Sequence, residues 1–174
     1  MNILHLSLTD LVGGASRAGY RIHRAQVDNG MSSQFFTLNR TSADPTVLAP
    51  TSKGAKFCTL IRSNIENLLV KSLLGNTENP CSLNRMPFSQ IPQSYIHDAD
   101  IINLHFVAGA LLPVSLRPLR GKRIVWTLHD MWAFGGIEHY TRENDAAMWR
   151  TGAKAVHSMF DSVSYTHLTL PTKA

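Results

Sequence analysis

Histidines and carboxylates follow directly after an apolar stretch of the chain. The stretch 124–128 is uncharged and rich in β-branched and aromatic residues, which predicts a buried strand. His129 and Asp130 come next, and Glu138 and His139 follow a few residues later. Imidazole and carboxylate groups can hydrogen-bond ligand hydroxyls, and they can stabilise charge at a reacting centre. The sequence therefore predicts a site at the carboxyl end of this strand, where open α/β sheets bind ligands.

A second strand is predicted to end in polar residues near position 105. The run 98–104 is apolar at its centre, and Asn103 and His105 stand at its end. Alternate residues of a strand share one face, so these two side chains are expected to point the same way. They either line a cleft or hydrogen-bond neighbouring loop backbone, and the second interpretation is slightly favoured for Asn103.

The chain opens with a predicted strand, a glycine turn and a helix. Residues 2–7 predict the strand, and Gly13 and Gly14 predict the turn. The helix carries apolar residues on one face, which are Ala18, Ile22 and Ala25. Glycines at the amino end of a helix let backbone amides approach an anion such as phosphate, although the spacing does not complete the motif G-x-G-x-x-G. Together these units predict an α/β fold, doubly wound around a mostly parallel, Rossmann-like sheet.

Each candidate residue has a structural alternative. His129 could cap the turn after its strand, but its place at a strand end favours function. Asp130 could orient His129, accept a hydrogen bond from a ligand hydroxyl, or cap the following turn. Adjacent residues rarely face the same way, so only one of Glu138 and His139 is expected to reach the cleft. Two further histidines are expected to be structural or surface residues, His5 and His23.

Composition is typical of a globular domain, with 44% hydrophobic and 17% charged residues. Cys58 and Cys81 are too few for a disulfide framework and suggest a reducing compartment. The start of the chain predicts a strand rather than a signal peptide, and no stretch reaches the ~18 apolar residues that span a bilayer. The net charge is +5, but lysine and arginine are dispersed and no motif interleaves them with aromatic residues. We therefore expect a cytoplasmic protein that does not bind nucleic acid.

Residues 57–74 predict an amphipathic helix. Apolar residues at positions 57, 60, 61, 65, 68, 69 and 73 follow helical spacing, and basic residues stand at 53, 56, 62 and 71. A helix packed on the sheet or at a domain edge is favoured, because such faces are common in soluble proteins and Glu66 makes the polar side less basic. Peripheral contact with anionic lipid at the inner face of the cell membrane is the alternative.

Three blocks occur in a recognisable order along the chain: Gly13–Arg24, Ala99–His105 and Trp126–Phe134. Together they resemble the amino-terminal domain of GT-B glycosyltransferases of family four, in the bacterial group that builds exopolysaccharide and O-antigen chains. The resemblance runs from Met1 to about residue 160. Many of those proteins carry Gly-Gly-Cys-His and further cysteines after the tryptophan. The stretch 135–140 has no cysteine, so cysteine-dependent features are not carried over.

The resemblance implies a retaining transferase that moves a sugar from a nucleotide-sugar donor to a growing, possibly lipid-linked, surface glycan. It implies that Gly13, Gly14 and His129 reach the reacting region, with His129 catalytic. The candidates for acceptor binding are His105, Asp130, Glu138 and His139. No cofactor or metal is expected, because the nucleotide-sugar is a co-substrate. The donor site is expected in a second domain outside residues 1–162, so this chain alone is expected to be inactive.

The last residues of the chain have a different character. Residues 163–172 match, residue for residue, one reading frame through a transposon-end sequencing adapter. We expect that the reading frame was cut near Ser162. On that interpretation residues 1–162 are a transferase domain that is incomplete at its carboxyl end, and residues 163–174 are a disordered scar.

Two other classes of function stay open. A metal-dependent hydrolase could use the histidines and carboxylates as ligands, but the sequence has no His-Glu-x-x-His motif or other compact ligand spacing. A non-catalytic α/β module could bind a sugar or phosphate ligand with the same residues, because binding an acceptor requires less than catalysis does.

Overall fold

The computed structural model describes residues 1–74, 81–82, 91–108, 119–135 and 139–140. The chain divides into two compact units, the first formed by 1–64 with 84–129 and the second by 65–83 with 130–174. The first unit contains the whole sheet and the helices α1 (Gly14–Asp28) and α3 (Gln93–Asp98). The helix α2 (Lys53–Leu74) belongs to both units, and the short helix α4 (Trp132–Gly135) belongs to the second.

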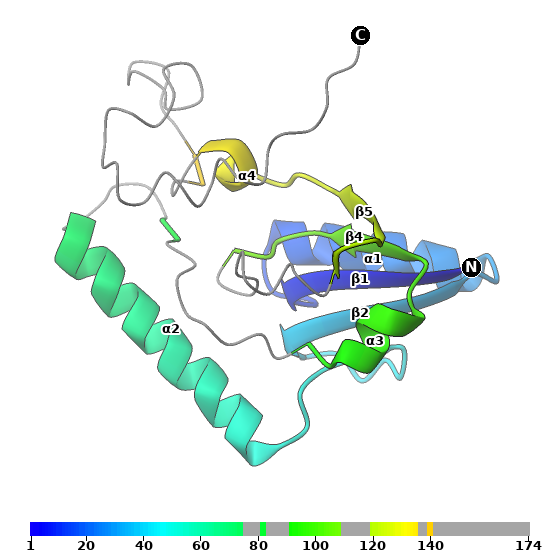
Figure 1. The fold of residues 1–174 in the computed structure, drawn as a ribbon, viewed down its shortest axis with the longest axis horizontal. Coiled ribbons are helices and arrows are strands. Elements are labelled where there is room, and N and C mark those ends of the chain that lie inside the picture. The colour runs from blue at the N-terminus through cyan, green and yellow to red at the C-terminus, as the bar shows by residue number, and fades with distance from the viewer. Residues whose placement is uncertain (75–80, 83–90, 109–118, 136–138, 141–174) are drawn as a thin grey trace, which may run out of the picture. The chain divides into compact units, whose positions relative to one another are not determined.

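Five parallel strands form one sheet in the order β3-β2-β1-β4-β5 (Figure 1). The strands are β1 (Asn2–Thr9), β2 (Ser32–Asn39), β3 (Val47–Leu48), β4 (Ile101–Leu104) and β5 (Arg123–Trp126). Helix α1 covers one face of the sheet and α3 covers the other (Figure 1). The predicted α/β fold with a doubly wound, Rossmann-like parallel sheet is therefore confirmed.

The winding direction changes beside β1. From β1 the chain moves through β2 to the edge strand β3, and it then returns to place β4 on the other side of β1. His5 consequently pairs with Phe35 of β2 on one side and with Asn103 of β4 on the other. Such a switch point lies between the carboxyl ends of two neighbouring strands, where doubly wound sheets bind their ligands.

The two faces of the sheet differ in polarity. The face under α3 is apolar, and its buried residues include Leu4, Leu6, Phe36, Ile102 and Leu104. Tyr95 of α3 packs against Phe36 there, with the ring centroids 6.1 Å apart. The opposite face, under α1, carries His5, Ser7 and Ser33, which are all buried. Polar atoms in such a place need hydrogen-bond partners from the covering helix.

Helix α1 therefore buries a different face from the one that its apolar residues predicted. Ser16, Gly19 and His23 are buried, whereas Ile22 is 37% exposed and Ala25 is also exposed. The face formed by Ala18, Ile22 and Ala25 is thus not the face that α1 buries. The polar groups on this face of the sheet need hydrogen-bond partners, so the polar side of the helix faces them. These hydrogen bonds outweigh the burial of two alanine side chains and one isoleucine side chain.

Strand β5 is exposed, although its apolar sequence predicted a buried strand. Ile124 and Val125 are 47% and 49% exposed, and among the described strands β5 lies at the edge of the sheet, where it pairs with β4. The prediction of burial was wrong, and that of a strand was confirmed. The stretch 163–174, which the sequence analysis interprets as a scar, lies outside the described residues.

The helix predicted over 57–74 is confirmed and begins earlier, at Lys53. Four of its apolar residues are exposed, namely Phe57, Ile61, Ile65 and Leu68. Within the part of the chain that the structure describes, no helix combines the length and the apolar character needed to cross a membrane.

Candidate functional site

His105 and His129 lie at the carboxyl ends of the adjacent strands β4 and β5. The strand pairing extends to His105 and to Thr127, because the amide of His105 donates to the carbonyl of Leu6 and the amide of Thr127 donates to the carbonyl of Leu104. The Nδ1 atom of His105 lies 3.1 Å from the Nε2 atom of His129, within hydrogen-bond distance. The structure thus joins the predicted catalytic histidine to a predicted substrate-binding histidine beside the switch point of the sheet.

The second ring nitrogen of His105 faces the core of the domain. Its Nε2 atom lies 2.8 Å from the Nδ1 atom of His5, and the Nε2 atom of His5 lies 2.7 Å from the Oε1 atom of Gln26. Both rings are buried, with His5 at 0% and His105 at 2% exposure. Both ring nitrogens of His105 are therefore engaged, and a direct hydrogen bond to a ligand would require one of these two contacts to break.

Burial controls the charge of these rings. Desolvation lowers the pKa of His5, although its hydrogen bond to Gln26 acts in the opposite direction. Desolvation, followed by the neighbouring rings of His5 and His129, lowers the pKa of His105 to about 3. Both rings are consequently neutral near pH 7, so each has one N–H donor and one lone-pair acceptor.

Helix α1 touches His105 directly at Gly19. A Cβ atom at this position would lie 2.8 Å from Cγ of His105, closer than carbon atoms approach in folded proteins. A side chain would therefore push either the helix or the ring away. Gly19 is the residue that allows α1 to lie against the histidine pair.

Asn103 shares its strand face with His105, as the alternation predicted, and it is buried. Its Oδ1 atom accepts a hydrogen bond from the Thr127 hydroxyl at 3.0 Å. This contact ties β4 to the end of β5, just before His129. Asn103 thus holds a neighbouring segment, although through a side chain rather than through loop backbone.

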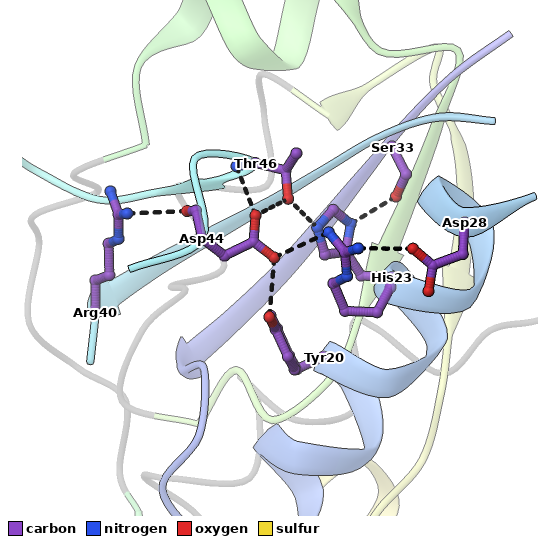
Figure 2. Close-up of polar contacts among 8 residues, drawn as sticks. Tyr20, His23, Asp28, Ser33, Arg40, Asp44 and Thr46 are labelled. Carbon is purple, nitrogen blue, oxygen red and sulfur yellow. Dashed lines mark hydrogen bonds and ion pairs between the residues drawn. The ribbon is translucent and has the colours of Figure 1, made fainter. Parts of the chain in front are cut away.

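A second polar cluster surrounds His23 on α1 (Figure 2). The Nδ1 atom of His23 lies 2.8 Å from the Ser33 hydroxyl, and its Nε2 atom lies 2.8 Å from the Thr46 hydroxyl. Desolvation, followed by the effect of His5, lowers the pKa of His23 to about 4. The sequence predicted a structural or surface role for His5 and His23, and both are buried structural residues. The signal that could have shown their proximity is strand alternation, which places His5 and Ser33 on the face that α1 covers.

Asp44 organises the segment between β2 and β3. Its carboxylate accepts hydrogen bonds from the hydroxyl of Thr46 at 2.5 Å and from the hydroxyl of Tyr20 at 2.9 Å, and it pairs with Arg24 at 3.2 Å (Figure 2). Burial alone would raise the pKa of Asp44, but the hydrogen bonds from Thr46 and Tyr20 and the charge of Arg24 lower it to about 2. Asp44 is therefore ionised near neutral pH.

Gly13 and Gly14 lie at the amino end of α1, and both are exposed. Gly13 has φ of 83°, a conformation that favours glycine, and the first turn of the helix contains no acidic residue. The side chain of Thr9 stabilises this turn. Its hydroxyl donates a hydrogen bond to the carbonyl of Val12 and lies 2.6 Å from the Ser16 hydroxyl. This geometry is compatible with the predicted approach of backbone amides to an anion.

Asp10, at the end of β1, is fully buried, and the sequence did not indicate it. Its carboxylate accepts hydrogen bonds from the backbone amides of Leu11, Thr41 and Ser42 and from the Thr41 hydroxyl. Burial alone would raise its pKa, but the bonds from Ser42 and Thr41 lower it to about 2. Asp10 thus joins the loop before Gly13 to the end of β2.

Asp130 and His139 form a separate cluster in the second unit. The Nδ1 atom of His139 lies 2.5 Å from Oδ2 of Asp130, and its Nε2 atom lies 2.9 Å from the Ser82 hydroxyl. The Oδ1 atom of Asp130 accepts a hydrogen bond from the amide of Trp132, so Asp130 also caps the turn that begins α4. His139 is 4% exposed and its two ring nitrogens both have partners. Glu138 lies outside the described residues. Ligand binding by Asp130, Glu138 and His139 stays a prediction.

Within the described residues, no three side chains of His, Cys, Asp or Glu come together in a way that could hold a metal ion. Comparison with known proteins supplies no relative: no family model, no curated protein and no solved structure matches the chain.

Proposed function

We propose that this chain is the acceptor-side domain of a retaining GT-B glycosyltransferase, which transfers a sugar from a nucleotide-sugar to a hydroxyl of a bacterial surface glycan. The observation that carries the proposal is the pair formed by His105 and His129 at the carboxyl ends of two neighbouring parallel strands, beside the switch point of the sheet. Doubly wound enzymes place their substrates there. Two of the three sequence blocks that resemble the family, Ala99–His105 and Trp126–Phe134, contain these two histidines.

In this proposal His129 forms a hydrogen bond with the sugar at the reacting centre. Its Nε2 atom lies within hydrogen-bond distance of His105, and we assign to the same ring a hydrogen bond with a sugar hydroxyl. A fixed donor or acceptor at that position would orient the sugar and ease the charge that develops as the glycosidic bond changes. His105 acts as a support, because it is buried between His129 and His5.

The exposed turn at Gly13 and Gly14 supplies the second contact. The first backbone amides of a helix have no intrahelical partners, and the helix dipole favours a negative charge beside them. The absence of acidic residues in this turn of α1 leaves that preference intact. We assign it to phosphate or hydroxyl oxygens of the substrates, while the principal donor site belongs to a second domain.

The acceptor is a glycan, either free or linked to lipid, and the protein works in the cytoplasm or at the inner face of the cell membrane. The exposed residues Phe57, Ile61, Ile65 and Leu68 of α2 support membrane contact, since they recur at helical spacing. No cofactor or metal ion forms part of the proposal, and nucleic acid is not a proposed partner.

The proposal is tested with the product of the parent gene, sequenced beyond the codon for Ser162. Assayed with a broad set of nucleotide-sugars and lipid-linked acceptors, it should transfer sugar, and His129→Ala should lower the rate by about a hundredfold or more, as loss of a charge-stabilising group does elsewhere. His97→Ala is the matched control, because His97 is exposed and lies on α3. Absence of transfer with every donor, or an unchanged rate in His129→Ala, would refute the proposal.

A non-catalytic binding module is the second candidate. The first compact unit supports it, because its sheet and glycine turn could bind a ligand without a further domain. If the gene ends after Ala174, saturation-transfer NMR with glycan fragments and inorganic phosphate becomes the deciding measurement. Binding that is lost in His129→Ala would then support the module. A metal-dependent hydrolase has less support, because none of the described residues form a metal-binding group.

A further inference from the structure

A continuous line of hydrogen bonds joins His129 to Asp44, and Gln26 stands at its middle. In order, the line passes through His129, His105, His5, Gln26, Ser33, His23, Thr46 and Asp44. Its longest link is the 3.1 Å between His105 and His129, and its shortest is the 2.5 Å between Thr46 and Asp44. The part from Ser33 to Asp44 is visible in Figure 2.

The direction of the bonds toward His129 follows from the Gln26 carbonyl. Oε1 of Gln26 accepts only, so the His5 nitrogen beside it, Nε2, must carry the proton. Neutral His5 then accepts at Nδ1, and His105 donates from Nε2. His105 in turn accepts at Nδ1, so that His129 donates from Nε2. The carbonyl orientation of one glutamine thus fixes the tautomers of all three histidines.

The same orientation places a different demand on His23. The Ser33 hydroxyl donates its only proton to Gln26, so it must accept from Nδ1 of His23. The Thr46 hydroxyl donates its only proton to Asp44, so it must accept from Nε2 of His23. Both nitrogens of His23 therefore need protons, which makes the ring a cation.

A cation at His23 is favourable only in acid, because burial lowers the pKa of His23 to about 4. The groups that act on this ring come from every element around it: His5 on β1, Arg24 and Asp28 on α1, and Asp44 before β3, with Tyr20 also in ring contact. Near neutral pH the ring carries one proton. If the Gln26 carbonyl still faced His5 and Ser33, the unprotonated nitrogen of His23 would then face a hydroxyl oxygen that has no proton to donate to it.

Rotation of the Gln26 amide by half a turn removes this conflict. Its NH₂ group then donates to both His5 and Ser33, and Ser33 donates to Nδ1 of neutral His23, which still donates to Thr46 from Nε2. Every bond toward His129 reverses as well. His5 and His105 carry their protons on Nδ1, and His129 accepts at Nε2 and carries its own proton on Nδ1.

We propose that Gln26 is a positioning residue that decides which nitrogen of His129 carries the proton, in step with the protonation of His23. Neutral His23 gives His129 a donor at Nδ1, whereas protonated His23 gives it an acceptor there. The catalytic meaning of this choice rests on the proposed function, since the position of the proton decides whether a given nitrogen of His129 donates or accepts a hydrogen bond. The tautomer itself can be measured without any transfer reaction.

The experiment is imidazole ¹⁵N NMR on the full chain with labelled histidine, with the His129 signals assigned through His129→Ala. At pH 7.5 the wild type should show protonated Nδ1 and unprotonated Nε2 in His129. Gln26→Glu places an acceptor-only carboxylate at the centre of the line, so the two resonances should exchange their positions at pH 8. Gln34→Glu is the matched control, because Gln34 is exposed on β2 and makes the same change of charge. It should leave His129 unchanged.

A second variant tests the link to His23. Ser33→Ala cuts the line between Gln26 and His23, so His129 should show resonances averaged between the two tautomers. The proposal is overturned if His129 keeps the wild-type tautomer in Gln26→Glu, or if Ser33→Ala leaves it unaltered. A transfer assay that fails while the tautomers respond as expected would refute the proposed function and leave the positioning role of Gln26 standing.

Discussion

The Nε2 atom of His105 lies 2.8 Å from the Nδ1 atom of His5, although the two residues are 100 positions apart in the chain. The contact joins β1 to the segment after β4, where the sheet changes its winding direction. Both rings are buried, and burial lowers both pKa values, so they meet as a neutral donor and a neutral acceptor. Through this pair the position of His129 is connected to the core of the domain.

Mild acid should destabilise the fold at pH values well above those at which its buried carboxylates become protonated. The pKa values of His105 and His23 are lowered to about 3 and about 4, from 6.5. Between these values and 6.5 the unfolded chain binds more protons than the folded chain, so the free energy of unfolding falls as the pH falls. At pH 5 each of the two histidines should cost about 2 kcal/mol relative to pH 8.

Urea unfolding at pH 8, 7, 6 and 5 checks this loss. Asp10 and Asp44, whose pKa values are lowered to about 2, contribute stability that is lost only below about 3.8 and therefore lie outside this window. His97→Gln should leave the pH dependence unchanged, because His97 is exposed. A flat profile from pH 8 to 5 would contradict neutral burial of the two rings.

Gly19→Ala should destabilise the domain by about 1–3 kcal/mol, the usual cost of overpacking. The added methyl group would meet Cγ of His105 at 2.8 Å, so the ring or the helix must move. Gly14→Ala is the matched control on the same helix, since its methyl group would meet no atom within 4 Å. The comparison is made by urea unfolding, and equal midpoints for the two variants would show that α1 does not press on His105.

Asp10→Ala should cost on the order of 3 kcal/mol, because it removes a buried carboxylate and leaves the amides of Thr41 and Ser42 without their charged acceptor. Asp28→Ala removes another carboxylate, one that is exposed and paired with Arg24 on the surface of α1. That change should cost less than about 1 kcal/mol. Thermal or urea unfolding compares the two variants. A small effect of Asp10→Ala would show that Asp10 does not anchor the loop.

The exposed face of α2 should bind anionic vesicles. Changing both Phe57 and Leu68 to serine should weaken co-sedimentation by about tenfold or more, since each buried apolar side chain contributes roughly 1.5 kcal/mol or more. Met31→Ser removes an apolar side chain exposed elsewhere and should have no effect. Equal binding by the double variant and the wild type would assign α2 a packing role.

His139→Ala should lower stability by about 2 kcal/mol, because it deprives both Asp130 and Ser82 of a buried partner. Ser82→Ala removes only the outer link and should cost about 1 kcal/mol or less. Unfolding measurements on both variants give the comparison. A His139→Ala variant that is fully stable but binds acceptor more weakly would instead support the predicted ligand contact.

The strands were predictable because their apolar runs and polar ends lie within a few residues of one another. Residues 2–7, 98–105 and 124–128 each indicated a strand, and the same reasoning placed His105 and His129 each at the end of a strand. The structure showed that these two strands are neighbours. The exposure of β5 was not predictable, because the sequence does not show whether a strand lies at the edge of the sheet. A run such as Ile124–Leu128 reads the same in either position.

The sequence by itself determined the α/β class and the parallel, doubly wound arrangement, because periodicity and glycine turns act locally. The tertiary structure alone decided that α1 buries Ser16, Gly19 and His23 rather than its apolar face. It also decided that His5, Gln26 and His23 belong to the same line of hydrogen bonds as His129. The physical reason is that hydrogen-bond partners distant in sequence are selected by strand order and register, which bring His5 beside His105 across a separation that no local pattern spans.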